Sequence, residues 1–194
     1  MKFALCLGMV APFLKISGTV QARDTALLID NFSSSDLISK LGTPWRGVSD
    51  QVMGGVSQGQ VNHDSILGRN CLRIRGNVRL DNNGGFIQAA LDLRKSRGLL
   101  DASSYKGIRL AVYGNDEKYS LHLRTPDNTR PWQSYRAHFS AQAAWSVIDL
   151  PFAEFEPYRT QRPLDISRLR RLGLVAIGRD FTADLAVSEI GFYS

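Results

Sequence analysis

The feature that most constrains what this chain can fold into is a hydrophobic period of two, which recurs along the sequence beyond residue 25. Successive side chains of a β-strand point to opposite faces of a sheet, so such alternation predicts strands with one face in a core. The runs that read as strands are Leu27–Phe32, Leu72–Arg75, Phe86–Leu91, Ile108–Tyr113, Tyr119–Arg124, Tyr135–Phe139, Trp145–Leu150, Leu172–Ile177 and Leu185–Phe192.

The segments between these runs predict turns. Asn82–Gly85, Gly114–Asp116 and Thr125–Asn128 are rich in Asn, Gly, Asp and Pro. Only Ser33–Lys40 and Asp165–Arg171 resemble helical turns, and both are too short to cross over between parallel strands. Many short strands without intervening helices predict an all-β fold, an antiparallel β-sandwich.

Length and composition fit one globular domain. The chain has 194 residues, of which 43% are hydrophobic and 22% charged, and a formal net charge of +6. Those proportions exclude a disordered chain. Two cysteines, Cys6 and Cys71, allow one disulfide at most and exclude a disulfide-dense scaffold. No apolar run reaches the roughly 18–20 residues that span a bilayer, so we do not expect an integral membrane protein.

The first 22 residues differ from the rest and predict a signal peptide. Lys2 gives a positive start, Phe3–Leu14 is apolar, and Val20–Ala22 offers small or β-branched residues for cleavage. A buried N-terminal strand or helix is the alternative. We therefore expect a single domain of residues 23–194 that is exported to the periplasm or cell envelope, or that is cytoplasmic if the segment is not a signal.

The catalytic patterns in the sequence do not predict an enzyme. Residues 55–59 match G-x-S-x-G, but that motif works only at a strand-to-helix turn on an α/β sheet. The residues that follow, Gln60–Asp64, read as a strand or a turn. His63, His122 and His138 lack the spacing of metal ligands. We expect no catalytic residue, no metal site and no cofactor.

Separating the two faces of the predicted strands places basic side chains opposite the core. If Tyr119–Arg124 and Ser134–Phe139 pair through the turn between them, one sheet face collects several of them. The predicted members of this basic face are Arg109, Tyr113, His122, Arg124, Arg136 and His138, and Arg73 and Arg75 could extend it.

Two interpretations of the basic face are open. It is either a solvated outer face, on which arginine stems cover the sheet, or a binding face for an acidic ligand. That ligand would be an anionic glycan, a phosphorylated headgroup or an acidic protein segment. Nucleic acid is not expected, because only Tyr113 and Trp132 could stack on bases and no recognised motif is present.

A long and unusual string of residues resembles a known family. Residues 49–59, S-D-Q-V-M-G-G-V-S-Q-G, resemble the signature of the complex I intermediate-associated protein family. Further matches are Asn83-Gly84-Gly85-Phe86, the Tyr135–Phe139 strand, and Trp145 followed by Pro151-Phe152 and Phe155. The resemblance runs from about Leu28 to Tyr193.

The resemblance implies a galactose-binding-like jelly-roll sandwich, similar to carbohydrate-binding modules. Mitochondrial members of the family are assembly factors, which act as chaperones for respiratory complex I intermediates without being subunits of the finished enzyme. The resemblance therefore implies a protein that binds other proteins.

The signature loop and one turn supply further candidate contact residues. Asp50 can accept backbone N–H groups in a turn, Gly54 and Gly55 permit unusual backbone conformations, and Met53 can pack adaptably against a partner. A loop that closes one end of the sandwich and a loop that touches a ligand are both open. Trp132 is the aromatic side chain that we expect to be exposed.

Two functions are in competition at this point. The leading hypothesis is a non-catalytic binding or assembly module that recognises a protein client, such as an intermediate of a membrane complex, through Asp50–Gly59 and the basic face. The alternative is an exported, carbohydrate-binding-like module that recognises an acidic glycan or another anionic envelope ligand.

Overall fold

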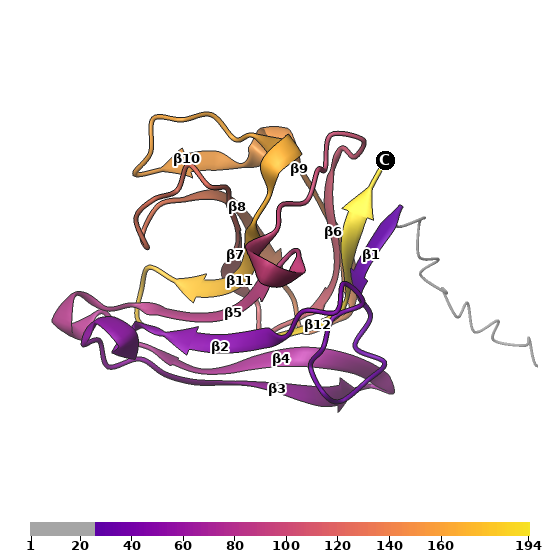
Figure 1. Cartoon of the computed structure of the whole chain (residues 1–194). Coiled ribbons are helices and arrows are strands. Elements are labelled where there is room, and N and C mark those ends of the chain that lie inside the picture. The colour runs from indigo at the N-terminus through magenta and orange to yellow at the C-terminus, as the bar shows by residue number, and fades with distance from the viewer. Residues whose placement is uncertain (1–25) are drawn as a thin grey trace, which may run out of the picture.

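Two antiparallel β-sheets pack face to face in the computed structural model, which describes residues 26–194 (Figure 1). Within that range the helical elements are short 3-10 turns, and no helix is long and apolar enough to cross a membrane. The predicted signal peptide lies outside the described residues, so it stays a prediction.

We call one sheet the back sheet. Across it, in order, lie β3 (Gln58–Ile66), β4 (Arg69–Val78), β12 (Phe181–Tyr193), β6 (Gly107–Tyr113) and β9 (Ser146–Pro151), and β1 (Leu27–Asp30) also pairs with β12.

We call the other sheet the front sheet, and its outer face is concave. Across it lie β10 (Glu156–Tyr158), β8 (Ser134–Ala141), β7 (Glu117–Arg124), β11 (Arg171–Ile177), β5 (Phe86–Asp92) and β2 (Trp45–Ser49). In Figure 1, β10 and β8 lie above β11, whereas β5 and β2 lie below it, so that the sheet curls around the space at the left of the view.

The hydrophobic core lies between the sheets and takes alternate residues from both. Fully buried members include Leu72, Ile74, Leu110 and Leu185 of the back sheet and Leu91, Leu121, Tyr135 and Leu172 of the front sheet. Each buried Leu or Ile contributes roughly 2 kcal/mol. A register shift of one residue would turn a strand's whole apolar set outward, so this burial fixes which residues face out.

The predicted antiparallel sandwich is confirmed, and each of the predicted runs forms a strand. The sequence pattern did not indicate β2 and β10 and left β3 open between a strand and a turn, and all three lie at sheet edges. An edge strand has fewer buried neighbours, so its apolar alternation is weak. Of the two predicted helical turns, Asp165–Arg171 contains the 3-10 turn Ile166–Arg168, whereas Ser33–Lys40 forms bends and turns without a helix.

Candidate ligand-binding cleft

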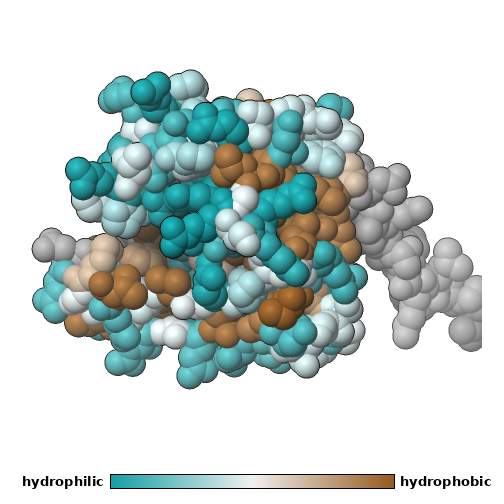
Figure 2. Space-filling model, in the orientation of Figure 1, coloured by the Kyte–Doolittle hydropathy of each residue, from teal (hydrophilic) through white to brown (hydrophobic). Residues whose placement is uncertain are grey.

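The outer face of the front sheet is hollowed into an open cleft of about 640 Å³. Its floor is made of side chains that alternate with the core residues of β5, β11 and β7, including Gln88, Val175 and His122. Figure 2 shows the hollow at the left, with hydrophobic residues along its lower rim. The cleft is therefore built by the curl of one sheet.

The strand register places Arg136, His122 and Gly173 side by side across three strands. Arg136 of β8 lies opposite His122 of β7, which in turn lies opposite Gly173 of β11. A Cβ atom at Gly173 would lie 2.0 Å from Gln88 Nε2, so the amide of Gln88 occupies the space that a side chain would fill. Gly173 thus keeps the middle of the floor low.

Arg136 stacks on an aromatic ring from the edge of the sheet. Its guanidinium carbon lies 3.4 Å from the centroid of the Tyr158 ring, and its Nε donates to Ser134 Oγ at 3.1 Å. Burial lowers the pKa of Arg136, against an opposing contribution from Tyr158. The cation is fixed in position but is poorly solvated.

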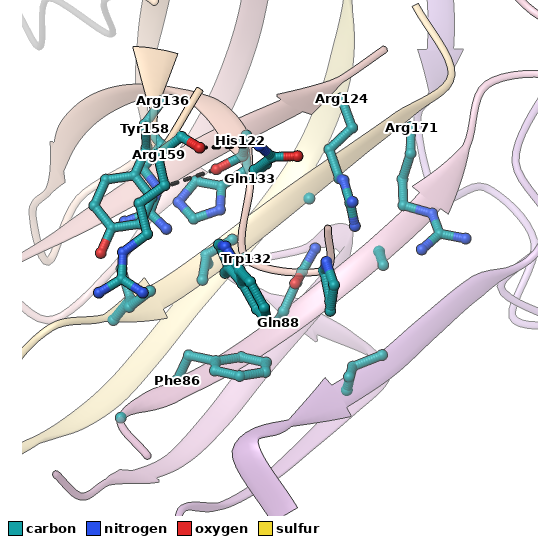
Figure 3. Close-up of a pocket in the computed structure, with 18 of the residues that line it drawn as sticks. Phe86, Gln88, His122, Arg124, Trp132, Gln133, Arg136, Tyr158, Arg159 and Arg171 are labelled. Atoms are coloured by element: carbon teal, nitrogen blue, oxygen red, sulfur yellow. Dashed lines mark hydrogen bonds between the residues drawn. The ribbon is translucent and has the colours of Figure 1, made fainter. Parts of the chain in front are cut away.

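Arg124 ties down the loop that carries Trp132. Its Nη2 donates to the carbonyl oxygens of Asn128 (3.1 Å) and Arg130 (2.7 Å), whereas its buried Nε has no partner. Burial lowers the pKa of Arg124 to about 10, and the nearby positive charges of Arg170 and Arg171 add to the effect. Figure 3 shows Arg124 and Arg171 projecting from neighbouring strands at one end of the cleft.

His122 is a buried, neutral imidazole in the cleft floor. Its side chain is 8% exposed, and its Nε2 has no hydrogen-bond partner. Burial lowers the pKa of His122 to about 3, and the positive charges of Arg136, His138 and Arg124 lower it further in the same direction. The ring is therefore uncharged at neutral pH.

The described lining of the cleft holds four arginines, Arg124, Arg136, Arg159 and Arg171, and no carboxylate. Arg171 is neutralised from outside the lining, because its Nε lies 2.7 Å from Asp92 Oδ1. Arg124 and Arg136 have no carboxylate within ion-pair distance among residues 26–194. The positive charge in the cleft is thus left uncompensated.

The signature loop owes its conformation to Asp50, which is fully buried. Oδ1 of Asp50 accepts from the Ser57 N–H (2.9 Å), and Oδ2 accepts from Ser57 Oγ–H (2.5 Å) and from the N–H groups of Gly85 (2.5 Å) and Phe86 (3.3 Å). Burial by itself raises the pKa of Asp50, but these hydrogen bonds outweigh it and hold the pKa below its usual value. Asp50 joins three chain segments.

Close packing against Asp50 explains two glycines of the matched motifs. A Cβ atom at Gly55 or Gly84 would lie 2.4 or 2.5 Å from the Asp50 carboxyl group, which no side chain could tolerate. Gly54 ends the 3-10 turn Asp50–Met53 with a φ of 85°, a conformation that favours glycine. The loop closes one end of the sandwich.

The prediction that Asp50 contacts a ligand is wrong, whereas the same prediction for Gly54 and Gly55, which lie outside the cleft lining, stays a prediction. Asp50 has no exposed surface, and neither glycine lines the cleft. Met53, in contrast, does line the cleft and is 56% exposed. Its neighbour Val52 also lines the cleft and is 72% exposed. The polar and glycine positions hold the loop, and the apolar positions face outward.

The predicted basic face is only partly a single face. His122, Arg124 and Arg136 share the cleft, and the pairing of β7 with β8 is confirmed. Arg109 and Tyr113 belong to β6, so they lie on the back sheet, and so do Arg73 and Arg75 of β4. Alternation along a strand shows which residues point away from the core, but not to which sheet the strand belongs.

Two other predicted residues have different outcomes. His138 is on the outer face of the front sheet, but it is exposed, pairs through Nδ1 with Ser120 Oγ (2.8 Å), and does not line the cleft. Trp132 is 47% exposed, as predicted, and lines the cleft from its turn. Further lining residues, which were not predicted from the sequence, are Phe86, Gln88, Gln133, Tyr158, Arg159 and Arg171.

Ser57, the centre of the G-x-S-x-G match, is fully buried and occupied by structural hydrogen bonds. Its Oγ donates to Asp50 and accepts from the Arg79 N–H at 3.0 Å, so it is not offered to a substrate. Within residues 26–194, the His, Cys, Asp and Glu side chains form no group that could hold a metal ion.

The two-sheet sandwich has the fold of jelly-roll carbohydrate-binding modules. Two structures of the family 11 carbohydrate-binding module of Clostridium thermocellum, one with a β-1,3-1,4-mixed-linked tetrasaccharide, share the fold at a TM-score of 0.65 and 14% identity. The alignments cover 86% and 87% of this chain and 93% and 95% of those chains. A family 30 module from the same organism has a TM-score of 0.61 at 15% identity, covering 87% of this chain and 98% of that one.

The family follows from the sequence. Residues 31–187 match the model described as Complex I intermediate-associated protein 30 (CIA30), and the chain belongs to that family. No curated protein matches the chain. The low identity to the carbohydrate-binding modules shows a common fold alone.

Proposed function

We propose that this protein is a non-catalytic binding module of the chaperone-like assembly-factor kind, and that it holds a segment of a protein client in the front-sheet cleft. The observation that carries the proposal is an open cleft with exposed apolar side chains on its rim and uncompensated positive charge on its floor. Membership of the complex I intermediate-associated family supports a client that belongs to a membrane complex under assembly.

The rim of the cleft has the composition of a protein contact. Val52 and Met53 project from the signature loop on one side, and Trp132 projects from the 125–133 loop above the floor. Methionine packs against varied partners because its side chain is flexible and polarizable, and tryptophan is enriched where proteins meet. These side chains would be covered by a bound segment.

The chemistry of the described residues supports binding without catalysis. Ser57 is buried, and Nε2 of the neutral His122 ring has no hydrogen-bond partner among the described residues. A nucleophile needs a base within hydrogen-bond reach, and the cleft lining contains no such pair.

Photo-crosslinking in cells tests the proposal. A photoreactive phenylalanine analogue replaces Met53 or Trp132 in the full-length tagged chain, and the matched control carries it at Leu67, which is 79% exposed at the far β3–β4 turn. We expect the same client, identified by mass spectrometry as a membrane-complex subunit, from both cleft positions and not from Leu67. Equal labelling from all three positions would contradict the proposal.

A second candidate function is recognition of an acidic glycan by an exported module. Tyr158 and Trp132 line the cleft together with the amides of Gln88 and Gln133, a combination of aromatic and hydrogen-bonding groups that suits sugars, and the fold is shared with carbohydrate-binding modules. Polyuronate should then bind more tightly than neutral mixed-linked β-glucan, and added salt should weaken the binding. Mass spectrometry of the mature N-terminus tests the predicted export, which implies a start at Arg23.

A further inference from the structure

Three basic or imidazole side chains line the cleft from the same face of two adjacent strands. Arg136 and His122 are register partners on adjacent strands, and Arg124 follows His122 by two positions on β7, so it shares the same face. Figure 3 shows the His122 ring next to the Arg136–Tyr158 stack. The group is rigidly supported, because Tyr158 and Ser134 hold Arg136 while the Asn128 and Arg130 carbonyl groups hold Arg124.

Two polar atoms of this group lack partners. His122 Nε2 and Arg124 Nε are buried and form no hydrogen bond within the described chain. The third such atom, Asn128 Nδ2, belongs to the loop that Arg124 holds and not to the cleft lining. Buried polar atoms in folded proteins are almost always hydrogen-bonded, so two of them in one cleft mark a place that a bound group would complete.

The charge of these side chains favours an anion as the ligand. Arg124 and Arg136 are both partly buried and have no carboxylate partner among residues 26–194, whereas Arg171, which also lines the cleft, is paired with Asp92. Guanidinium groups bind carboxylates through charge-assisted hydrogen bonds. Arg124 Nε–H, the Nη–H groups of Arg136 and, in the matching tautomer, His122 Nε2–H can donate to the oxygens of a carboxylate.

We propose that His122, Arg124 and Arg136 form a seat for one carboxylate of the client, the side chain of an Asp or Glu residue. This inference rests on the proposed function, since a protein client is what brings the side chain to the cleft. The exposed rim around Met53 and Trp132 would take the apolar residues that flank the acidic one. The cleft would therefore prefer client segments with an acidic residue among apolar neighbours.

Imidazole NMR on the full-length protein tests the seat directly. The chain has 3 histidines, so the His122 signals are assigned by their loss in His122→Gln, and the other two serve as internal references. The probes are the blocked peptides acetyl-Met-Ala-Glu-Ala-Trp-amide and its Gln analogue, with sodium acetate and sodium chloride at matched ionic strength. We expect a saturable shift of His122 with the Glu peptide and with acetate, and at least tenfold weaker binding of the Gln peptide.

Variants distinguish binding at these three residues from nonspecific attraction to the positive charge of the protein. Arg136→Gln should weaken binding of the Glu peptide at least tenfold, whereas Arg75→Gln, a 62% exposed arginine on the back sheet, should leave it unchanged. Arg124→Lys keeps the charge but removes Nε–H and one carbonyl contact. It should also weaken binding of the Glu peptide, so it tests the proposal if Arg136→Gln fails to fold. Equal binding of the Glu and Gln peptides, or a His122 response to chloride equal to that to acetate, would overturn the proposal.

The remaining outcomes distinguish this inference from the proposed function. Trigalacturonate that binds tenfold more tightly than the Glu peptide would overturn the client carboxylate in favour of a glycan. Client crosslinking at Met53 that persists at full yield in Arg136→Gln, without any Glu-peptide binding, would overturn the seat and leave the proposed function standing. Glu-peptide binding without any client crosslink would leave the carboxylate chemistry standing and overturn its assignment to a client.

Discussion

Arginines stand on the outer faces of both sheets, but their surroundings differ. On the back sheet, Arg73 donates to Asp184 and Asp64 at 2.8 Å, and Arg109 donates to Asp149 at 2.6 Å. Hydrogen bonds to these carboxylates raise the pKa of both back-sheet arginines. On the front sheet, burial lowers the pKa of Arg124 and of Arg136, and neither has a carboxylate partner in the described chain. Arg73 and Arg109 are therefore neutralised on the back sheet, whereas the charges of Arg124 and Arg136 on the front sheet are not.

The largest expected change in stability tests whether a buried charge without a counter-ion always destabilises this fold. Asp50 is such a charge, but four donors hold it. Asp50→Ala would leave those donors buried and unsatisfied, so we expect a loss of roughly 3–5 kcal/mol in the free energy of unfolding. Chemical denaturation measures it, with the exposed Asp81→Ala as the control. A loss below about 1 kcal/mol would show that water replaces the carboxylate.

The next largest change in stability is expected from replacing Arg73, a carboxylate-paired arginine of the back sheet. Arg73→Met removes the cation between Asp64 and Asp184 and leaves two partly exposed carboxylates close together on the back sheet. We expect a loss of about 2 kcal/mol, less than for a fully buried pair because both carboxylates keep some water. High salt should shrink the loss by screening the repulsion between the carboxylates. An unchanged denaturation midpoint would contradict a structural role for this pair.

The third effect follows from the neutral state of His122. The pKa of His122 is about 3 in the folded protein, against an ordinary value of 6.5, so the unfolded chain binds a proton between these values that the folded chain does not. The free energy of unfolding therefore falls as pH falls below 6.5, by about 1.4 kcal/mol per pH unit where the unfolded imidazole is fully protonated. Denaturation of the protein and of His122→Gln between pH 7 and 5 should show that slope only in the parent.

The smallest change in stability is expected from replacing Arg136, an arginine of the front sheet without a carboxylate partner in the described chain. Arg136→Met removes a partly buried cation without a carboxylate partner, so relief of desolvation offsets the lost stacking on Tyr158. We expect stability to change by less than about 1 kcal/mol in either direction, measured beside Arg73→Met under the same conditions. A loss as large as that of Arg73→Met would show that Arg136 is structural after all.

Most of the fold was predictable because the core strands alternate strongly, and the strands that were not predicted are the edge strands β2 and β10. The cleft was less predictable. The hairpin of β7 and β8 identified His122, Arg124 and Arg136 because its strands are adjacent in sequence. Placing Arg109 correctly required knowing that β6 joins β12 and β9, a pairing between segments far apart in the chain.

The residues that sequence reasoning missed had usable but weaker signals. Phe86 and Gln88 alternate with the buried Ile87 and Ala89, so their outward direction could be inferred, but not that the strand lies in the cleft. Tyr158 lies on a three-residue strand with a proline, which gives no periodicity at all. The stack of Arg136 on Tyr158 therefore depends on tertiary structure.

The hydrogen bonds between Arg124 and the loop that carries Trp132 connect the cleft to the fluorescence of this tryptophan. Of the 3 tryptophans in the chain, Trp45 is 4% exposed and donates to Asp30, and Trp145 is partly buried and donates to the Ile66 carbonyl oxygen, whereas Trp132 is 47% exposed above the cleft. A group that binds Arg124 also acts on the carbonyls that hold this loop, and so on the solvation of its indole. Occupancy of the cleft should thus shift the emission wavelength of a single residue, which makes binding visible in dilute solution without any label.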